Sequence, residues 1–560
     1  MRKWKTLAAS LLLVTVLACS GTVPRSQLAS NGPQISSELR QIVDSAKIPE
    51  LRWPDFANLS ASVRTVYERN SFNPLWFTAG ELSHKGQEIL AALESSTAKG
   101  LDPEEYDLQR LSRWAQQLRT SSPVERERSA TLDVALTVDL MRYAAALHQG
   151  RIDPRQVRFA IRSKDCLDPA GFVLKYLRGE QSLPEALTQI EPSFNGYRKT
   201  LAALVHYQQL ASQEPSRIPV QPRLPLRPGQ TYTDLPVIAA RLESLGDLIP
   251  ISPESARSDL YDGRVQEAVK SFQIRHGLPS TGIIDLATWK ALTTPLSERV
   301  EQLALTLERW RWIPSSVAPA IVVNIPEFEL RAFDEKGKLV LRMHVIVGKA
   351  YRRKTPVFED RLEGIILRPA WTVPLSIQRG EMVPKIRADP NYLRANDLEI
   401  VDRDDQPVPW DQQEPLTSRL ASGDLRLRQR PGPENSLGLI KFDFPNDYSV
   451  YMHGTPARQL FSRARRDFSH GCIRLENPEW LAEWVLRDDP GWDRAKIAAA
   501  CNADRTLRIP LRRPLAVLVL YGTAIVEENG EVRFFDDIYG YDAELRKALA
   551  ARKRSGTSCP

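Results

Sequence analysis

Apolar residues in the first half of the chain recur at the spacing of amphipathic helices. Leu132, Leu136, Leu140, Tyr143 and Leu147 stand three or four residues apart, which places them on one face of a helix. Similar patterns return throughout residues 37–212. We therefore predict a largely helical domain there, a scaffold without chemistry of its own.

Prolines interrupt this helical pattern. Pro219, Pro222 and Pro225 stand three residues apart, a spacing that favours an extended polyproline segment over a packed element. We expect residues 213–232 to be a linker and a domain boundary.

A second, smaller helical region follows at residues 233–293. Val265, Ala268, Val269 and Phe272 have helical spacing, and Gly-containing turns separate this run from its neighbours. The pattern predicts a small bundle of three helices. Helical spacing then continues from residue 297 to residue 312.

The last third of the chain changes to short runs of branched residues, which are typical of strands. We expect strands at residues 321–325, 339–347, 364–367, 440–444, 449–453 and 515–523. These runs define a mostly-β domain at residues 318–505, followed by a C-terminal strand and tail at 506–560. The fold class is thus α+β and multidomain.

One segment inside the mostly-β domain lacks the alternation of strands. Residues 375–435 are polar and rich in proline and aspartate. We interpret them as a capping insertion, because long insertions in compact domains tend to be lids or binding loops.

Composition supports a globular protein with an anionic partner. The 560 residues include 42% hydrophobic and 26% charged residues, and 76 basic against 69 acidic residues give a net charge of +7. Nucleic acid, anionic lipid and an acidic cell-wall polymer all fit this charge. Since no basic tract is interleaved with aromatic residues, we expect no nucleic-acid partner.

The N-terminus has the layout of a secretory signal at residues 1–19. Basic residues precede an apolar run from residue 7 to residue 17, and small residues follow. An uncleaved anchor is the alternative, although the run is shorter than the ~20 residues of a spanning helix. Residues 16–19 also resemble a lipoprotein signal, so membrane attachment through a lipidated Cys19 is open.

The other cysteines are too few and too widely spaced for a disulfide framework or a zinc site. We expect Cys166 and Cys501 to be buried apolar residues or one disulfide, and Cys559 to lie at the chain end. The scattered histidines supply no metal set, so we expect neither metal nor cofactor.

The fourth of these cysteines, Cys472, lies in a passage that carries chemistry: Ser469-His470-Gly471-Cys472-Ile473-Arg474, with His453 upstream. A nucleophilic cysteine needs a base or a positive charge to become a thiolate. His453 ends a predicted strand and is our choice of base. His470 is expected to shape the turn and donate hydrogen bonds, and Gly471 indicates a tight turn whose amides face an oxyanion.

A histidine, fifteen residues and then Ser-His-Gly-Cys-x-Arg resembles the signature of the L,D-transpeptidase family. The resemblance implies that Cys472 attacks the substrate carbonyl, that His453 exchanges its proton, and that the Gly454 carbonyl orients the histidine. It also implies that Arg474 binds a stem carboxylate or braces the loop. Relatives often have serine where His470 stands.

Three further residues are expected to line the substrate pocket. Tyr451 shares a strand face with His453, and Trp371 and Ser469 are the other two. For Tyr451 and Trp371, ordinary packing is an equally good interpretation.

The resemblance extends to large Gram-negative members, which join a helical scaffold, a three-helix peptidoglycan-binding domain and a catalytic domain with a capping insertion. It implies a periplasmic enzyme whose partners are peptidoglycan stem peptides, as acyl donor and acceptor, and other cell-wall synthesis enzymes. It also implies that penem-type β-lactams, carbapenems among them, acylate Cys472.

The chemistry implied is 3→3 crosslinking through a thioester, with release of D-alanine. Water as acceptor would make the protein an L,D-carboxypeptidase, and a protein lysine would attach an outer-membrane lipoprotein to peptidoglycan. A non-catalytic wall-binding scaffold that uses only residues 233–293 is the alternative from another class.

Overall fold

The computed structural model describes most of the chain after the N-terminal segment. The expected signal peptide, Cys19 and Cys559 lie outside the described residues. Within them, no helix combines the length and apolar character needed to cross a membrane. The described residues are 32–78, 81–119, 127–161, 165–215, 217–249, 258–314, 319–350, 353–389, 391–410 and 413–555.

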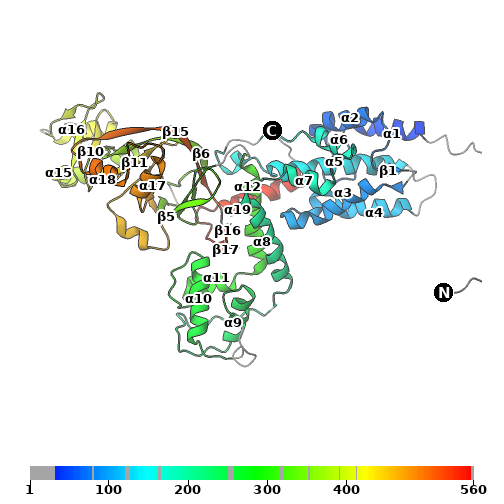
Figure 1. Cartoon of the computed structure of the whole chain (residues 1–560), viewed down its shortest axis with the longest axis horizontal. Helices are drawn as coiled ribbons and strands as arrows, with labels where there is room; N and C mark the ends of the chain where they lie inside the picture. Colours follow the sequence, from blue (N-terminus) through cyan, green and yellow to red (C-terminus); the bar gives the residue numbers. More distant parts are fainter. Residues whose placement is uncertain are drawn as a thin grey trace, which may run out of the picture.

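The N-terminal part is helical, as predicted (Figure 1). The predicted apolar stripe of α5 is fully buried, and the helices around it bury their own stripes on it. A two-stranded ribbon, β1 (Phe77–Thr78) and β2 (Glu81–Leu82), joins two of them. The helices are α1 (Gly32–Ser45), α2 (Ser60–Arg69), α3 (His84–Glu94), α4 (Leu108–Arg119), α5 (Glu127–Gln149), α6 (Pro169–Leu177), α7 (Leu183–Ile190) and α8 (Asn195–Ser212).

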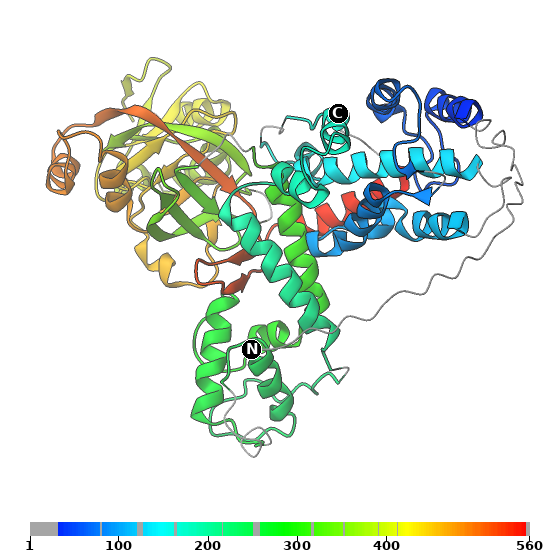
Figure 2. The same ribbon diagram turned by 45° about the vertical axis from the view of Figure 1, so that its right-hand side comes forward.

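A three-helix bundle projects from the rest of the molecule (Figure 2). It consists of α9 (Leu235–Ser244), α10 (Gly263–Arg275) and α11 (Leu286–Thr293). Asp262 and Asp285 cap the second and third helices, because their carboxylates accept hydrogen bonds from Val265 N at 2.9 Å and Thr288 N at 2.8 Å.

The linker prediction for residues 213–232 is partly wrong. Leu226 is buried in the core of the bundle and pairs with Ile284, and Thr231 forms a bridge with Leu260. The second half of the proline-rich segment therefore belongs to the bundle. The reason is that the apolar side chain of Leu226 is more stable in the core of the bundle than in water.

Helix α12 (Leu296–Trp312) connects the three parts of the molecule. The Glu308 carboxylate is fully buried and accepts hydrogen bonds from Arg151 Nε at 3.0 Å and from Ile152 N at 3.2 Å. Arg311, also fully buried, approaches the same carboxylate at 3.7 Å. A buried charge must be paired, so this cluster fixes α12 against the scaffold.

The core of the mostly-β domain is a nine-stranded sheet in the order β13-β5-β14-β12-β11-β6-β15-β3-β4. β5 also pairs with β4, which closes the sheet into a barrel around an apolar core. The strands are β3 (Ile321–Asn324), β4 (Glu329–Phe333), β5 (Leu339–Gly348), β6 (Phe358–Leu367), β11 (Ile440–Asp443), β12 (Met452–His453), β13 (Asp467–Ser469), β14 (Ile473–Leu475) and β15 (Leu507–Leu520).

The domain boundary expected at residue 505 falls inside this sheet. β15 pairs with β6 on one side and β3 on the other, so the segment after residue 505 is central to the mostly-β domain. Around it lie helices α17 (Pro478–Val485) and α18 (Arg494–Asn502), the hairpin β16 (Ala524–Val526) and β17 (Val532–Phe534), and helix α19 (Tyr541–Ser555).

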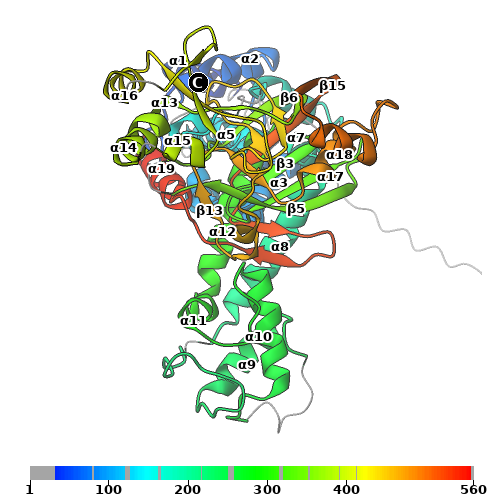
Figure 3. The same cartoon turned by 90° about the vertical axis from the view of Figure 1, so that its left-hand side faces the viewer.

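The capping insertion is a folded subdomain with an apolar core of its own (Figure 3). It begins slightly earlier than predicted, at β7 (Trp371–Thr372), in a sheet of order β7-β10-β8-β9. The other strands are β8 (Leu398–Val401), β9 (Pro407–Val408) and β10 (Arg426–Gln429). Its helices are α13 (Leu375–Ile377), the π-helical turn η7 (Gln378–Met382), α14 (Val383–Ala388), α15 (Tyr392–Ala395) and α16 (Gln413–Ser422).

The described cysteines differ from the prediction in one respect. Cys501 is buried with a free thiol, whereas Cys166 is exposed and disulfide-bonded. The disulfide considered between these two residues is therefore absent.

The buried Glu308 cluster gives a stability prediction. Glu308→Ala leaves Arg311 and part of Arg151 buried without a counter-charge, which should lower the free energy of unfolding by about 3–5 kcal/mol. Thermal denaturation measures this as a lowered Tm.

The matched control on the same helix is Glu301→Ala. Glu301 pairs with Arg546 at 2.6 Å at the surface, and an exposed pair contributes about 1 kcal/mol or less. Equal small shifts in Tm for both variants would contradict the role given to Glu308.

Candidate active site

Strand pairing places His453 beside the cysteine loop. β12 and β14 run parallel, with Met452 opposite Ile473 and His453 opposite Arg474. Side chains alternate along a strand, so Met452 and Ile473 enter the core while His453 and Arg474 lie on the other face. Cys472 directly precedes β14 and is a diagonal neighbour of His453 on that face.

The His453 ring is fixed by the backbone. It is 4% exposed, and its Nδ1 lies 2.6 Å from the Gly454 carbonyl oxygen. A carbonyl only accepts hydrogen bonds, so Nδ1 carries the proton and Nε2 keeps a free lone pair. Burial, followed by the positive charge of Arg474, lowers the pKa of His453 to about 3. The imidazole is therefore a neutral base at physiological pH.

The turn before the cysteine is held from several sides. Gly471 adopts φ +120°, a conformation that favours glycine, and its carbonyl accepts a hydrogen bond from Thr355 Oγ1 at 2.7 Å. Ser469 Oγ donates to the Cys472 carbonyl at 2.5 Å and accepts from Gly471 N at 3.1 Å. These contacts fix the direction in which Cys472 points.

Two expectations for this turn need correction. Ser469 is 1% exposed with its hydroxyl used inside the turn, so it is a positioning residue and does not line a substrate pocket. The Gly471 N–H is already bonded to Ser469, which leaves the Cys472 N–H and the Arg474 guanidinium as donors for an oxyanion.

The Cys472 thiol is protonated in the resting site. Burial raises its pKa, although hydrogen bonds from Tyr451 and the charges of Lys441 and Arg474 oppose this shift. The sulfur also lies 3.9 Å from the Ser449 carbonyl oxygen. A neutral thiol and a neutral imidazole lie as diagonal neighbours on one face of the sheet, an arrangement in which the imidazole can accept the thiol proton.

Tyr451 lies beside the Cys472 sulfur, and Trp371 lies against Tyr451. Burial, then the neighbouring Cys472, raises the pKa of the Tyr451 hydroxyl well above its ordinary value, and this hydroxyl hydrogen-bonds with both Cys472 and Trp371. The Tyr451 ring lies 5.5 Å from the His453 ring. Because Trp371 belongs to β7, the capping subdomain is linked to Cys472 through Tyr451.

Lys441 is a site residue that the sequence analysis missed. It pairs with His453 across β11 and β12, and its Nζ lies 4.5 Å from the centre of the Tyr451 ring. Its charge acts on Cys472 through this position. Only the cross-strand register shows this, because Lys441 is an ordinary strand lysine in the sequence.

His470 contacts the capping subdomain. Its Nε2 lies 2.8 Å from the Glu381 carboxylate, which also binds Arg353 at 2.7 Å. Glu381 lies in η7, so this contact fastens the nucleophile turn to the insertion. Glu381 and Arg353 carried no signal in the sequence.

Arg474 is free to bind a ligand. Its Nε is buried without a hydrogen-bond partner among the described residues, and burial lowers the pKa of its guanidinium while Cys472 opposes the shift. An unpaired buried guanidinium is costly, and a carboxylate or oxyanion would satisfy it.

Comparisons with known proteins agree with this geometry. Residues 318–497 match the L,D-transpeptidase catalytic domain, residues 61–204 a scaffold domain and residues 233–292 a putative peptidoglycan binding domain. A protein of Haemophilus influenzae named "Putative L,D-transpeptidase" is 33% identical over 261 residues, 46% of this chain and 51% of that protein. The chain thus spans about half the length of this curated relative.

A solved structure is more weakly similar. The crystal structure of an L,D-transpeptidase from Stackebrandtia nassauensis aligns with 54% of this chain and 97% of its own, at 13% identity and a TM-score of 0.20.

The raised pKa of Cys472 gives a prediction for alkylation. Iodoacetamide reacts with thiolates, so the rate at Cys472 should be low at pH 7 and should still be rising above pH 9. Intact-mass spectrometry gives the rate, and Cys472→Ser shows the background from Cys501. A rate that levels off below pH 7 would reveal a preformed thiolate–imidazolium pair and contradict this description.

Proposed function

Because the chain carries an L,D-transpeptidase catalytic domain, a peptidoglycan-binding domain and a scaffold domain, we propose that it forms 3→3 crosslinks between peptidoglycan stem peptides. The reaction proceeds through a thioester on Cys472 and releases D-alanine. The observation that carries the proposal is a neutral His453, oriented by the Gly454 carbonyl, beside a cysteine on a constrained turn.

The first step forms the thioester. The Cys472 sulfur attacks the carbonyl between the L-centre and the D-centre of a tetrapeptide stem, and its proton passes to His453 Nε2. The Cys472 N–H and Arg474 stabilise the oxyanion. When the C–N bond breaks, His453 returns the proton to the amine of the departing D-alanine.

The second step transfers the acyl group. An amine on a second stem attacks the thioester carbonyl, and His453 removes a proton from the attacking nitrogen. The C–S bond breaks and Cys472 regains its proton, so the enzyme returns to its starting state. The product is an amide that joins two stems.

The remaining domains support a location at the cell wall, which we propose to be the periplasm. The domain at residues 233–292 would hold the enzyme on its polymeric substrate. A polymer bound at one site raises the effective concentration of stems at the other. Attachment through a lipidated Cys19 and contact with other cell-wall synthesis enzymes belong to the same proposal.

Product analysis tests the proposed function. Purified disaccharide-tetrapeptides are incubated with the protein and with Cys472→Ala, and the products are weighed by mass spectrometry. We expect cysteine-dependent dimers that have lost D-alanine. Tripeptides alone would indicate a carboxypeptidase, and no change in either sample would contradict the enzymatic proposal.

The choice of base has its own test. His453→Ala should lower the rate of acylation of Cys472 by about 100- to 10,000-fold, because it removes the general base. His470→Ala should lower it less than about tenfold, since a positioning residue acts only through the turn. Acylation by a penem-type β-lactam, followed by intact mass, measures both rates. A larger loss in the His470 variant would reverse the assignment.

A further inference from the structure

Residues that pair across neighbouring strands form a continuous row, which begins near the nucleophile and extends across the sheet. His453 pairs with Lys441, Lys441 with Ile366 and Ile366 with Arg508, so the row crosses from β12 through β11 and β6 to β15. Arg474 begins the row on β14. The proton-transfer residue and Arg508 therefore lie at one level of the sheet.

A second row runs beside the first and starts at the cysteine. Asp443 pairs with Gly364, and Gly364 with Pro510. The register of β11 and β12, extended by one residue, places Tyr451 between Asp443 and Cys472. The members of both rows lie opposite the buried side chains of their strands, so they share the outer face of the sheet.

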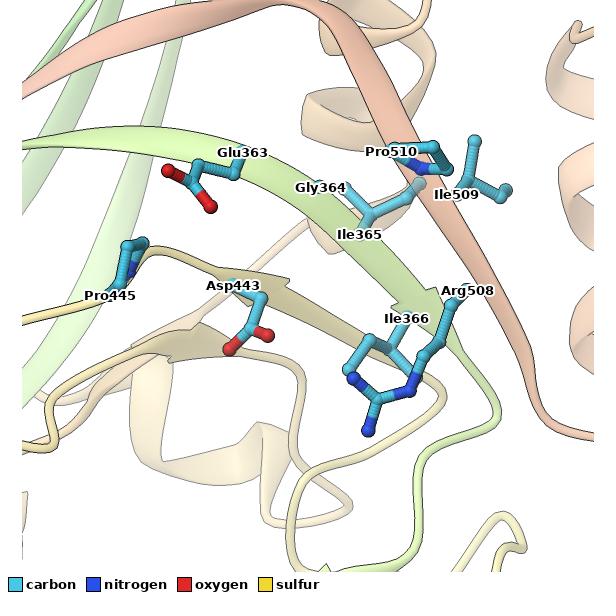
Figure 4. Close-up of a pocket in the computed structure, with 9 residues that line it drawn as sticks. All are labelled: Glu363, Gly364, Ile365, Ile366, Asp443, Pro445, Arg508, Ile509 and Pro510. Carbon is cyan, nitrogen blue, oxygen red and sulfur yellow. The ribbon is translucent and has the colours of Figure 1, made fainter.

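At the end of both rows farthest from Cys472, the sheet surface over β11, β6 and β15 contains a groove of about 270 Å³ (Figure 4). Figure 4 shows the side chains of Glu363, Asp443, Ile366 and Arg508 on the same side of the strands. The lining residues are Glu363, Gly364, Ile365, Ile366, Asp443, Pro445, Arg508, Ile509 and Pro510.

Two charged groups of this groove are without partners. The side chains of Arg508 and Glu363 are exposed and take part in no ion pair or hydrogen bond within the described part of the chain. Asp443, by contrast, binds Lys441 at 2.8 Å. The groove thus offers a free guanidinium to a carboxylate at the end farthest from Cys472.

Because His453 carries out both proton transfers, its position indicates on which side of Cys472 the acceptor stem binds. His453 protonates the leaving amine and deprotonates the attacking amine, so both amines pass through the same position, next to Nε2. His453 lies one strand closer to the groove than Cys472 does. The attacking amine therefore comes from the groove side of the nucleophile.

On this basis, and resting on the proposed function, we propose that the groove binds the acceptor stem, with a stem carboxylate on Arg508. Three strand spacings separate β12 from β15, about 14 Å at ~4.8 Å each. Four extended residues span about the same distance at ~3.5 Å each. An acidic stem peptide can thus place its amine at His453 and a carboxylate at Arg508.

The test separates transfer from hydrolysis. The protein receives unlabelled tetrapeptide donor and an isotopically labelled tripeptide stem, which lacks D-alanine and can act only as acceptor. We expect Arg508→Glu to lower the ratio of labelled dimer to unlabelled hydrolysed tripeptide by about tenfold, the effect of losing one charge-assisted contact. The rate at which tetrapeptide acylates Cys472, a step that precedes reaction with any acceptor, should stay within about twofold of the unsubstituted protein when measured by acid quench and intact mass.

The matched control is Arg361→Glu. Arg361 is another exposed arginine without a charged partner among the described residues, on β6 but outside the groove, and its substitution should leave the ratio unchanged. An unchanged ratio in Arg508→Glu would overturn the inference. So would an equal fall in dimer formation and in the rate of Cys472 acylation, which would assign Arg508 to the donor or to the fold. Failure of the unsubstituted protein to release D-alanine would instead refute the proposed function.

Discussion

The parallel pairing of β12 and β14 is the constraint on which the site depends. It sets His453 against Arg474 and brings Cys472 to the same face of the sheet. Parallel neighbours cannot be joined by a tight turn and need a connection of about a dozen residues or more. The fifteen residues between His453 and Ser469 provide that connection. The spacing of the motif is therefore a consequence of the topology.

Burial then determines the protonation of the two reacting groups. It lowers the pKa of His453 to about 3 and raises the pKa of Cys472, so both groups are neutral at pH 7. For His453, stability is highest above the ordinary pKa of histidine, near 6.5, and is lost as the pH falls toward 3. For Cys472 the direction is opposite, and stability is lost as the pH rises above the ordinary thiol pKa of 9.0. In the proposed mechanism, charge separates only when a substrate enters, and the positive charges of Arg474 and Lys441 act on Cys472.

The sequence was sufficient to predict the features that depend on local hydrophobic pattern or on the cysteine motif at residues 469–474. The stripe of α5, the helices of the small bundle and the strands expected at residues 440–444 and 449–453 follow from the spacing of apolar residues. Contacts made only through tertiary register were missed: Lys441 under Tyr451, and Glu381 on His470. The central position of β15 was also missed, because a strand far along the chain carries no mark of its sheet neighbours.

Direct observation of the intermediate tests the central claim, that a neutral His453 activates Cys472 for acyl transfer. The protein is mixed with tetrapeptide stem, quenched in acid after milliseconds to seconds, and its intact mass and the peptide containing Cys472 are measured. The account predicts an adduct on Cys472 equal to the stem minus D-alanine, formed at a rate that is nearly constant from pH 5 to pH 8. An adduct on another residue, or a formation rate that follows a group titrating near pH 6.5, would contradict it.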